Sequence, residues 1–284
     1  MPASGIDRIV AQTSQVVIGE FRLPADHPSF RDTGPISHCI VVFPRTSVWI
    51  RHEGSRAFLA DPTVSTIYNR GQRYERVPHS ALGDHCDWFG VSDNVAREIA
   101  ATLEPRAADS PAPFQFQRAP SDTRLYFRQR RLLARARRGE LDDLEQEEEV
   151  MAVVGDVLRS AHTTAIGSGA RRPGAAARHR QLAESARAEL LRTVTQNLSV
   201  HDIAARVHTS PYHLCRVFRS VTGRTMHEYR AELRVRLSLE MLADSAASLS
   251  TVAHELGFAS HSHFVTALRR HLGDTPSAVR AALR

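Results

Sequence analysis

Two stretches near the C-terminal end of the sequence, residues 210–222 and 261–272, carry side chains that can read a nucleic acid. Apolar residues recur in them every three or four positions, which predicts helices with one buried face. The predicted buried positions are Leu214, Val217, Phe218 and Val221 in the first stretch and Phe264, Ala267, Leu268 and Leu272 in the second. The opposite faces carry polar and basic side chains that bind DNA phosphates or base edges.

Arg216 is the strongest predicted base reader, because it is central on its face and arginine pairs with guanine through two hydrogen bonds. A phosphate contact is the alternative, since phosphates and sugars take half to two-thirds of protein–DNA hydrogen bonds. Val265 and Thr266 offer few hydrogen bonds, so the second helix is expected to contact thymine methyl groups or mainly the backbone. Cys215 is interpreted as a small neutral helix residue rather than a redox switch. The predicted DNA-binding residues are Ser210, Tyr212, Cys215, Arg216, Arg219, His261, Ser262, Val265, Thr266 and Arg269.

Both stretches are the second half of an internal repeat. Residues 199–225 can be laid on residues 250–275, so that Ala204 matches Ala253. Each copy reads as a short helix with a small alanine, a turn, and a second helix that opens with a cap. This order is typical of a helix-turn-helix motif, and the repeat therefore predicts two of them.

Helix starts in this region are marked by capping residues. A predicted helix of about 19 residues, which lacks internal glycine and proline, links the two copies. At 1.5 Å per residue it spans roughly 28 Å, close to the roughly 34 Å between successive major grooves on one DNA face. One chain can therefore reach two adjacent grooves. The predicted caps are Ser210 before Pro211, Thr275 before Pro276, and Thr225 with Glu228 in a capping box.

Residues 198–280 resemble the DNA-binding domain of the AraC/XylS family of bacterial transcription regulators. The resemblance rests on the A…S-P-x-x-L-x-x-x-F-x-x-x-x-G pattern of the first copy, the linking helix from Tyr229 to Arg234, and the A-x-x-x-G-F-x-x-x-x-x-F pattern of the second. It implies seven helices in two subdomains, with the outward residues above on two recognition helices. Val279 and Ser238 depart from the family pattern at packing positions, where an aromatic residue and an alanine are usual.

The sequence of the first part of the chain predicts several short strands. Seven β-branched or aromatic runs between residues 15 and 92 alternate with turn residues, which indicates a β-barrel or sandwich. A helix is predicted from Asp93. The predicted fold class is α+β, with an N-terminal β-barrel or sandwich, a two-helix extension and an all-α C-terminal domain. This front half resembles, more loosely, the cupin-like sensing and dimerisation domain of the same regulators.

Two helices, residues 122–138 and 141–161, are predicted after a proline-rich loop. The first is basic and the second acidic, so an antiparallel hairpin would pair their charges and leave apolar stripes to pack on the barrel or on a second subunit. Glycine, alanine and proline then predict a flexible linker. The predicted domains are residues 1–164 (effector binding or dimerisation), 165–177 (linker) and 178–284 (DNA binding).

Charge is divided unevenly along the 284 residues. Residues 1–177 contain 22 arginines and 22 acidic residues, whereas residues 178–284 contain 15 arginines and 9 acidic residues and so hold the whole net charge of +6. This asymmetry favours a double-stranded DNA partner for the last third. No apolar run approaches the roughly 20 residues that a membrane span needs, and no signal peptide is evident, so a cytoplasmic protein without a membrane partner is expected. Three scattered cysteines predict neither disulfides nor a zinc site.

Four aromatic residues, Trp49, Tyr68, Trp88 and Phe89, form a candidate pocket for a small-molecule effector, with plain core as the alternative. His52, His79 and His85 with Cys39 or Cys86 would be the residues of a metal site, but the sequence lacks a His-x-His cluster before the linker, and loop histidines are the favoured interpretation. No catalytic, cofactor or metal residues are predicted.

These observations predict a sequence-specific transcription regulator that is not an enzyme and whose N-terminal domain senses a small molecule, dimerises, or does both. A homodimer is expected, and RNA polymerase is a further partner if the protein is an activator. Two alternatives stay open. One is a cupin-type metalloenzyme that retains a DNA-binding tail, and the other is a dimeric DNA-binding protein that needs no ligand.

Overall fold

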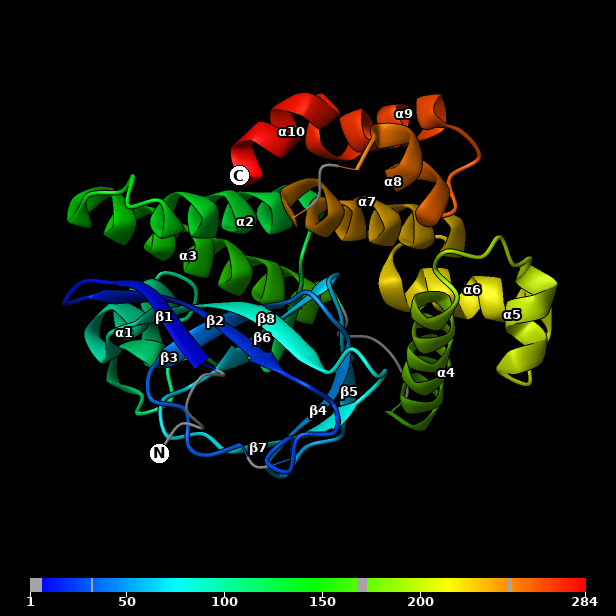
Figure 1. The fold of residues 1–284 in the computed structure, drawn as a ribbon. Coiled ribbons are helices and arrows are strands. Elements are labelled where there is room, and N and C mark those ends of the chain that lie inside the picture. Colours follow the sequence, from blue (N-terminus) through cyan, green and yellow to red (C-terminus); the bar gives the residue numbers. More distant parts are fainter. Residues whose placement is uncertain (1–6, 32, 168–172, 245–246) are drawn as a thin grey trace. The chain divides into compact units, whose positions relative to one another are not determined.

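The computed structural model describes residues 7–31, 33–167, 173–244 and 247–284. The chain forms two compact units, unit 1 (residues 1–168) and unit 2 (residues 169–284). Unit 1 contains all the strands of the described residues and unit 2 is helical (Figure 1). The predicted α+β class is therefore confirmed. No helix in the described part of the chain combines the length and apolar character that crossing a membrane requires.

Unit 1 is built on two antiparallel sheets (Figure 1). The larger sheet has the strand order β1-β2-β8-β3-β6-β9 and the smaller one the order β5-β4-β7. All seven predicted strands are present. The strands are β1 (Asp7–Gln12), β2 (Val16–Leu23), β3 (Cys39–Pro44), β4 (Val48–His52), β5 (Phe58–Ala60), β6 (Val64–Tyr68), β7 (Tyr74–Pro78), β8 (Asp84–Val91) and β9 (Arg118–Pro120). The sequence analysis missed β1 and β9.

An apolar core lies between the two sheets, because alternate residues of each strand point to the same side. Strands of both sheets contribute side chains to it, among them Val17, Val42 and Trp88 from the larger sheet and Ile50 and Phe58 from the smaller one. The ladders join the strands into two separate sheets rather than one closed barrel in the described residues. The arrangement is a sandwich.

The helices of unit 1 follow the strands. They are α1 (Asp93–Ala101), the 3-10 helix η1 (Pro105–Asp109), α2 (Thr123–Arg137) and α3 (Asp143–Gly167). The predicted pairing of opposite charges between α2 and α3 is confirmed. Arg128 contacts Glu149 at 2.9 Å and Asp156 at 3.1 Å, and Arg135 contacts Glu145 at 2.6 Å. A valine stripe of α3, which includes Val154, is buried.

Unit 2 contains seven helices in its described residues, the number that the family resemblance implies. They are α4 (Pro173–Arg192), α5 (Val200–Arg206), α6 (Pro211–Thr222), α7 (Met226–Asp244), α8 (Leu249–Glu255), α9 (His261–Leu272) and α10 (Pro276–Leu283). The long helix α7 contacts α4 and α6 as well as α8, α9 and α10 (Figure 1). It therefore joins the two helix-turn-helix copies.

Two expectations need correction. The predicted linker, residues 165–177, is helical at residues 165–167, which end α3, and at residues 173–177, which begin α4; residues 168–172 lie outside the described residues. Proline at the first position of a helix and a run of alanines favour this helix start. Val221, predicted as buried, has 37% of its surface exposed, because it lies in the last turn of α6, beyond the core positions.

Candidate nucleic-acid interface

Helix α6 is the second helix of the first copy, and it starts and stops as the sequence predicts. The Ser210 hydroxyl accepts a hydrogen bond from the His213 amide at 3.3 Å, and Pro211 occupies the first turn. Gly223 ends the helix in the left-handed conformation with φ 73°. Leu214, Val217 and Phe218 are buried, so the register of the helix on the core is fixed.

Helix α9 repeats this construction in the second copy. The Ser260 hydroxyl accepts a hydrogen bond from the His263 amide at 3.1 Å, and Gly273 ends the helix with φ 85°. Both helices have 12 residues. The predicted buried stripe, Phe264, Ala267, Leu268 and Leu272, is confirmed.

The turns before α6 and α9 share one backbone conformation. His208 has φ 54° and its counterpart Gly257 has φ 73°, both left-handed. In the first turn the Thr209 amide donates to the Ala204 carbonyl at 3.0 Å, and in the second the Phe258 amide donates to the carbonyl of Ala253 at 2.9 Å. The second copy has one more residue than the first between this shared turn and its serine cap. The left-handed conformation costs free energy for histidine but not for glycine, which lacks a Cβ atom.

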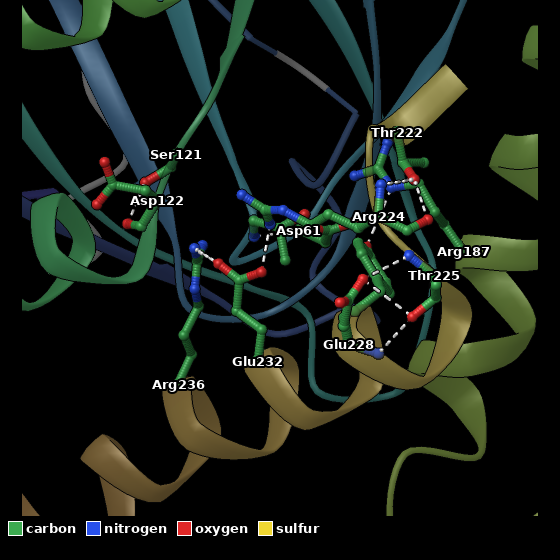
Figure 2. Close-up of polar contacts among 12 residues, drawn as sticks. Asp61, Ser121, Asp122, Arg187, Thr222, Arg224, Thr225, Glu228, Glu232 and Arg236 are labelled. Carbon is green, nitrogen blue, oxygen red and sulfur yellow. Dashed lines mark hydrogen bonds and ion pairs between the residues drawn. The ribbon is translucent and has the colours of Figure 1, made fainter. Parts of the chain in front are cut away.

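Helix α7 is anchored at its start by a capping box, which Figure 2 shows. The amide of Thr225 donates to Glu228 at 2.8 Å, and the amide of Glu228 donates to the Thr225 hydroxyl at 3.1 Å. This confirms the predicted capping box. Further along, the Glu232 carboxylate pairs with both Arg224 and Arg236 (Figure 2). The loop between α6 and α7 is thereby tied to the linking helix.

The predicted DNA-binding residues form two separate faces, one on each helix. Of all ten, only Val265 is half-buried; the others are exposed. Tyr212 lies on the first turn of α6 with 81% of its surface exposed. The Arg216 guanidinium lies 3.3 Å from Nδ1 of His213, one turn earlier on the same helix. These positions leave the polar and basic groups available to a ligand that lies along either helix.

Comparison with known proteins agrees with this geometry. A model of a family described as "Helix-turn-helix domain" matches residues 203–282, which include the second copy and all but the first four residues of the first. The regulatory protein SoxS of Salmonella typhimurium is 31% identical over 90 residues, which are 32% of this chain and 84% of SoxS. The chain belongs to the AraC/XylS family of transcription regulators.

Other relatives of this AraC/XylS chain match it over the same region. The bifunctional transcriptional activator and DNA repair enzyme AdaA of Bacillus subtilis is 30% identical over 30% of this chain and 41% of AdaA. The chain spans about 30 to 40% of the length of this and three other curated relatives. A solved DNA-binding domain of AdpA in complex with a target DNA is 35% identical, with 36% of this chain and 92% of that one covered and a TM-score of 0.34.

The four aromatic residues of the candidate effector pocket are divided in this AraC/XylS chain. Tyr68 and Trp88 both lie in the core between the sheets, and the Trp88 indole donates to Asp7 at 2.8 Å. Phe89 points to the opposite face of β8 and packs edge-on against Phe43 at 5.8 Å. Trp49 is half-buried, on the other face of β4 from its buried neighbours. Of these four residues, a pocket between the sheets can therefore include Tyr68 and Trp88 but not Phe89 or Trp49.

His52 is a polar residue of this interior whose burial was not predicted. Its ring is buried and lies 4.7 Å from the Tyr68 ring, and Nδ1 lies 2.8 Å from the Gln72 amide nitrogen. Burial lowers the pKa of His52 to about 4. The imidazole is thus neutral at physiological pH, and Nε2, which is buried, has no hydrogen-bond partner among the described residues. The alternation of inward and outward positions along β4 was the sequence signal that could have placed His52 on the inward face.

The residues weighed as an alternative metal site are not brought together, because β8 points Cys86 into the core and His85 to the opposite face. His85 instead lies with Glu20 and Asp87, and one ligand atom of each falls within 4.8 Å of the others. Arginines already neutralise these carboxylates: Arg45 contacts Asp87 at 3.0 Å and Arg137 contacts Glu20 at 2.6 Å.

The Glu20 carboxylate of this cluster has a perturbed pKa. The hydrogen bond from His85, together with Arg137 and Arg45, lowers the pKa of Glu20 to about 2 despite its partial burial. Arg130 of α2 adds a third cation, 3.3 Å from Asp87. The cluster is therefore an ion-pair network that holds α2 on the larger sheet, and its donor set does not favour a cation.

Proposed function

We propose that the chain is a sequence-specific DNA-binding transcription regulator, not an enzyme, and that α6 and α9 read two adjacent major grooves. The observation that carries this proposal is the repeated helix with an exposed polar and basic face, within a domain that holds the whole positive net charge. Membership of a family of transcription regulators supports it, as does the matched helix-turn-helix domain.

The two faces have different chemical capacity. Helix α6 offers Arg216, Arg219 and Tyr212, whereas the corresponding positions of α9 are Thr266, Arg269 and Ser262. Arginine reads guanine bidentately, and threonine contacts a thymine methyl group or a phosphate. We therefore assign most of the base discrimination to α6 and a mainly positioning role to α9.

Selection of bound sequences from random double-stranded DNA tests the proposal. The purified chain is expected to enrich one motif with two contacted segments about one helical turn apart, the spacing of successive major grooves. Footprinting on the enriched DNA should protect both segments. A selection that enriches no motif, at a salt concentration where nonspecific binding is weak, contradicts the proposal.

Unit 1 is proposed to bind a small-molecule effector between its sheets, to dimerise, or to do both. The neutral His52, with an unpartnered buried nitrogen beside Tyr68, supports a polar contact in this interior. A ligand that binds one state of unit 1 more tightly shifts the population of DNA-binding states. Thermal shifts with candidate effectors test binding, and the oligomeric state of the purified chain tests dimerisation. An activator would in addition contact RNA polymerase.

A metalloenzyme is the competing reading of unit 1, and Glu20, His85 and Asp87 are its best residues. Elemental analysis of the purified chain tests it. Stoichiometric iron, zinc or manganese that is lost in a His85→Ala variant would favour the enzyme. We expect no such dependence, because three arginines compensate the two carboxylates.

A further inference from the structure

A buried arginine of the linking helix lies where the two helix-turn-helix copies meet. Arg234 of α7 is 6% exposed. Its Nε donates to the Val194 carbonyl at 2.7 Å, and Nη2 donates to the Gln196 carbonyl at 3.1 Å and to Oδ1 of Asn197 at 3.0 Å. The guanidinium thus satisfies carbonyl groups of the turn that follows α4.

This turn is part of the core of the first copy. Val194 packs in one cluster with Ile203 of α5 and with Leu214 and Phe218 of α6. Because these side chains are buried together, the turn and α6 move as one body. A contact to the turn is therefore a contact to the first reading helix.

The second copy reaches the same guanidinium through its own turn. The Arg234 guanidinium carbon lies 5.8 Å from the centroid of the Phe258 ring, within the range of a cation–π contact. Phe258 packs in turn on Phe264 in the first turn of α9, with ring centroids 5.2 Å apart. Arg234 is thereby linked to the second reading helix.

Gly257 allows the two turns to approach this closely. A Cβ atom at this position would collide with the Thr195 carbonyl oxygen and would lie 2.9 Å from Nη2 of Arg234. The position is also left-handed. Glycine is required here by close approach as well as by conformation, whereas His208, its counterpart in the first copy, is exposed.

We propose that Arg234, the turn 193–198 and the pair Gly257–Phe258 form a joint that fixes α6 and α9 at the separation of two adjacent major grooves. Arg234 is a positioning residue in this joint, and the proposal that it serves groove spacing rests on the proposed function. The second contact is intramolecular in either case, but its effective concentration is highest when the two sites are already held at the spacing of the DNA, so a rigid pair binds more tightly than a pair whose geometry varies.

A distance measurement tests the joint without DNA. Spin labels are attached at Cys215 on α6 and at Thr266→Cys on α9; Cys39 and Cys86 are buried and protected from labelling. We expect a narrow distribution of the distance between the two labels in this chain, and a broad or displaced distribution when Arg234→Met is added. An unchanged distribution in a folded Arg234→Met variant overturns the joint, whatever the DNA result.

Arg230→Met is the matched control. Arg230 lies one turn earlier on α7 and donates to the same turn, to the Leu198 carbonyl at 2.9 Å and to the Gln196 carbonyl at 3.4 Å, but it makes no ring contact with Phe258 in the described part of the chain. Its loss should leave the distance distribution narrow. If Arg234→Met does not fold, Arg234→Lys and Asn197→Ala weaken the same contacts more gently, and we expect each to broaden the distribution; no broadening in either would overturn the joint.

A second measurement separates positioning from general destabilisation. On the selected DNA with both segments, Arg234→Met should lose affinity by at least about tenfold. On DNA that keeps only the segment read by α6, its affinity should stay within about twofold of the parent chain, because that face is intact. Equal losses on both DNAs would overturn the positioning role. Failure of the parent chain to select any motif would refute the proposed function and leave the spin-label result standing.

Discussion

The two helix-turn-helix copies have the same backbone and different surroundings. Their turns are left-handed at equivalent positions, His208 and Gly257, and their second helices begin at serine caps and end at left-handed glycines. The second turn packs closely against the carbonyl of Thr195, which follows α4, and against Arg234. The comparison teaches that a repeat can conserve its conformation while one copy contributes its turn to the scaffold, and we propose that the other copy supplies most of the base discrimination.

The largest expected effect is that of Gly257→Ala. A side chain at this left-handed position is strained, and its Cβ would meet the Thr195 backbone, so we expect a loss of about 3 kcal/mol or more in the free energy of unfolding. The helical circular dichroism signal during urea unfolding measures it. Fluorescence gives an internal reference, because both tryptophans, Trp49 and Trp88, belong to unit 1.

His208→Ala is the matched control at the equivalent position of the first copy. Histidine already adopts the left-handed conformation there, so the change should stay within about 1 kcal/mol. Similar losses for Gly257→Ala and His208→Ala would break the comparison, since the second turn would then have no special packing role.

Next in size is the difference between the two reading faces. Arg216→Ala should weaken specific binding by roughly 1–3 kcal/mol and relax discrimination at one base. Thr266→Ala, the equivalent change on α9, should cost less than about 1 kcal/mol, because it removes a methyl and a hydroxyl rather than a bidentate donor. Binding isotherms on the selected DNA and on single-base variants measure both. If Arg216→Ala weakens binding equally on all sequences, Arg216 is a phosphate clamp.

The helix caps give a smaller difference. Ser260→Ala removes the acceptor for the His263 amide and should cost about 1 kcal/mol of stability. Ser210→Ala should cost somewhat less, because Pro211 fixes the backbone of the first turn of α6. Urea midpoints of the two variants compare them, and a larger loss at Ser210 would contradict the assigned role of the proline.

The smallest effect concerns pH. His271 of α9 corresponds to Val221 of α6, and burial chiefly lowers the pKa of His271, with Arg270 acting in the same direction and Glu232 opposing it. The folded state therefore disfavours the protonated ring, and stability should fall as the pH drops below the ordinary histidine pKa of about 6.5. Urea unfolding at a series of pH values should show a weaker dependence for His271→Gln. Identical pH profiles would show that this ring does not couple to folding.

Much of this architecture follows from local sequence. The seven predicted strands and the starts of α1, α2, α6, α7 and α10 are present, because β-branched runs, Ser/Thr/Asp caps and Pro at the first turn act within a few residues. The missed strand β1 is mostly exposed and lacks a strong apolar pattern. The start of α4 was missed because its glycine, alanine and proline also fit a linker, although alanine is the best helix former.

The contacts that build the site were less accessible. Arg234 binds carbonyl groups about 40 positions earlier in the chain, and backbone carbonyls have no residue-type signature. The division of the aromatic pocket was readable, because neighbours in a strand such as Trp88 and Phe89 must face opposite ways. Nine of the ten predicted positions lie on α6 and α9 and followed from helical periodicity, and Ser210 followed from its place as a helix cap. Their contact with DNA remains a prediction.

Because α6 and α9 have matched ends and equal length, the outward side chains of one helix can be transferred to the other. Each begins at a serine, runs for 12 residues and stops at a left-handed glycine, so the register of the outward face is the same in both. Grafting Tyr212, Cys215 and Arg216 onto the equivalent positions of α9 would change what that helix reads without changing where it starts or ends. Such a chain should prefer DNA in which one short base sequence occurs twice in the same orientation.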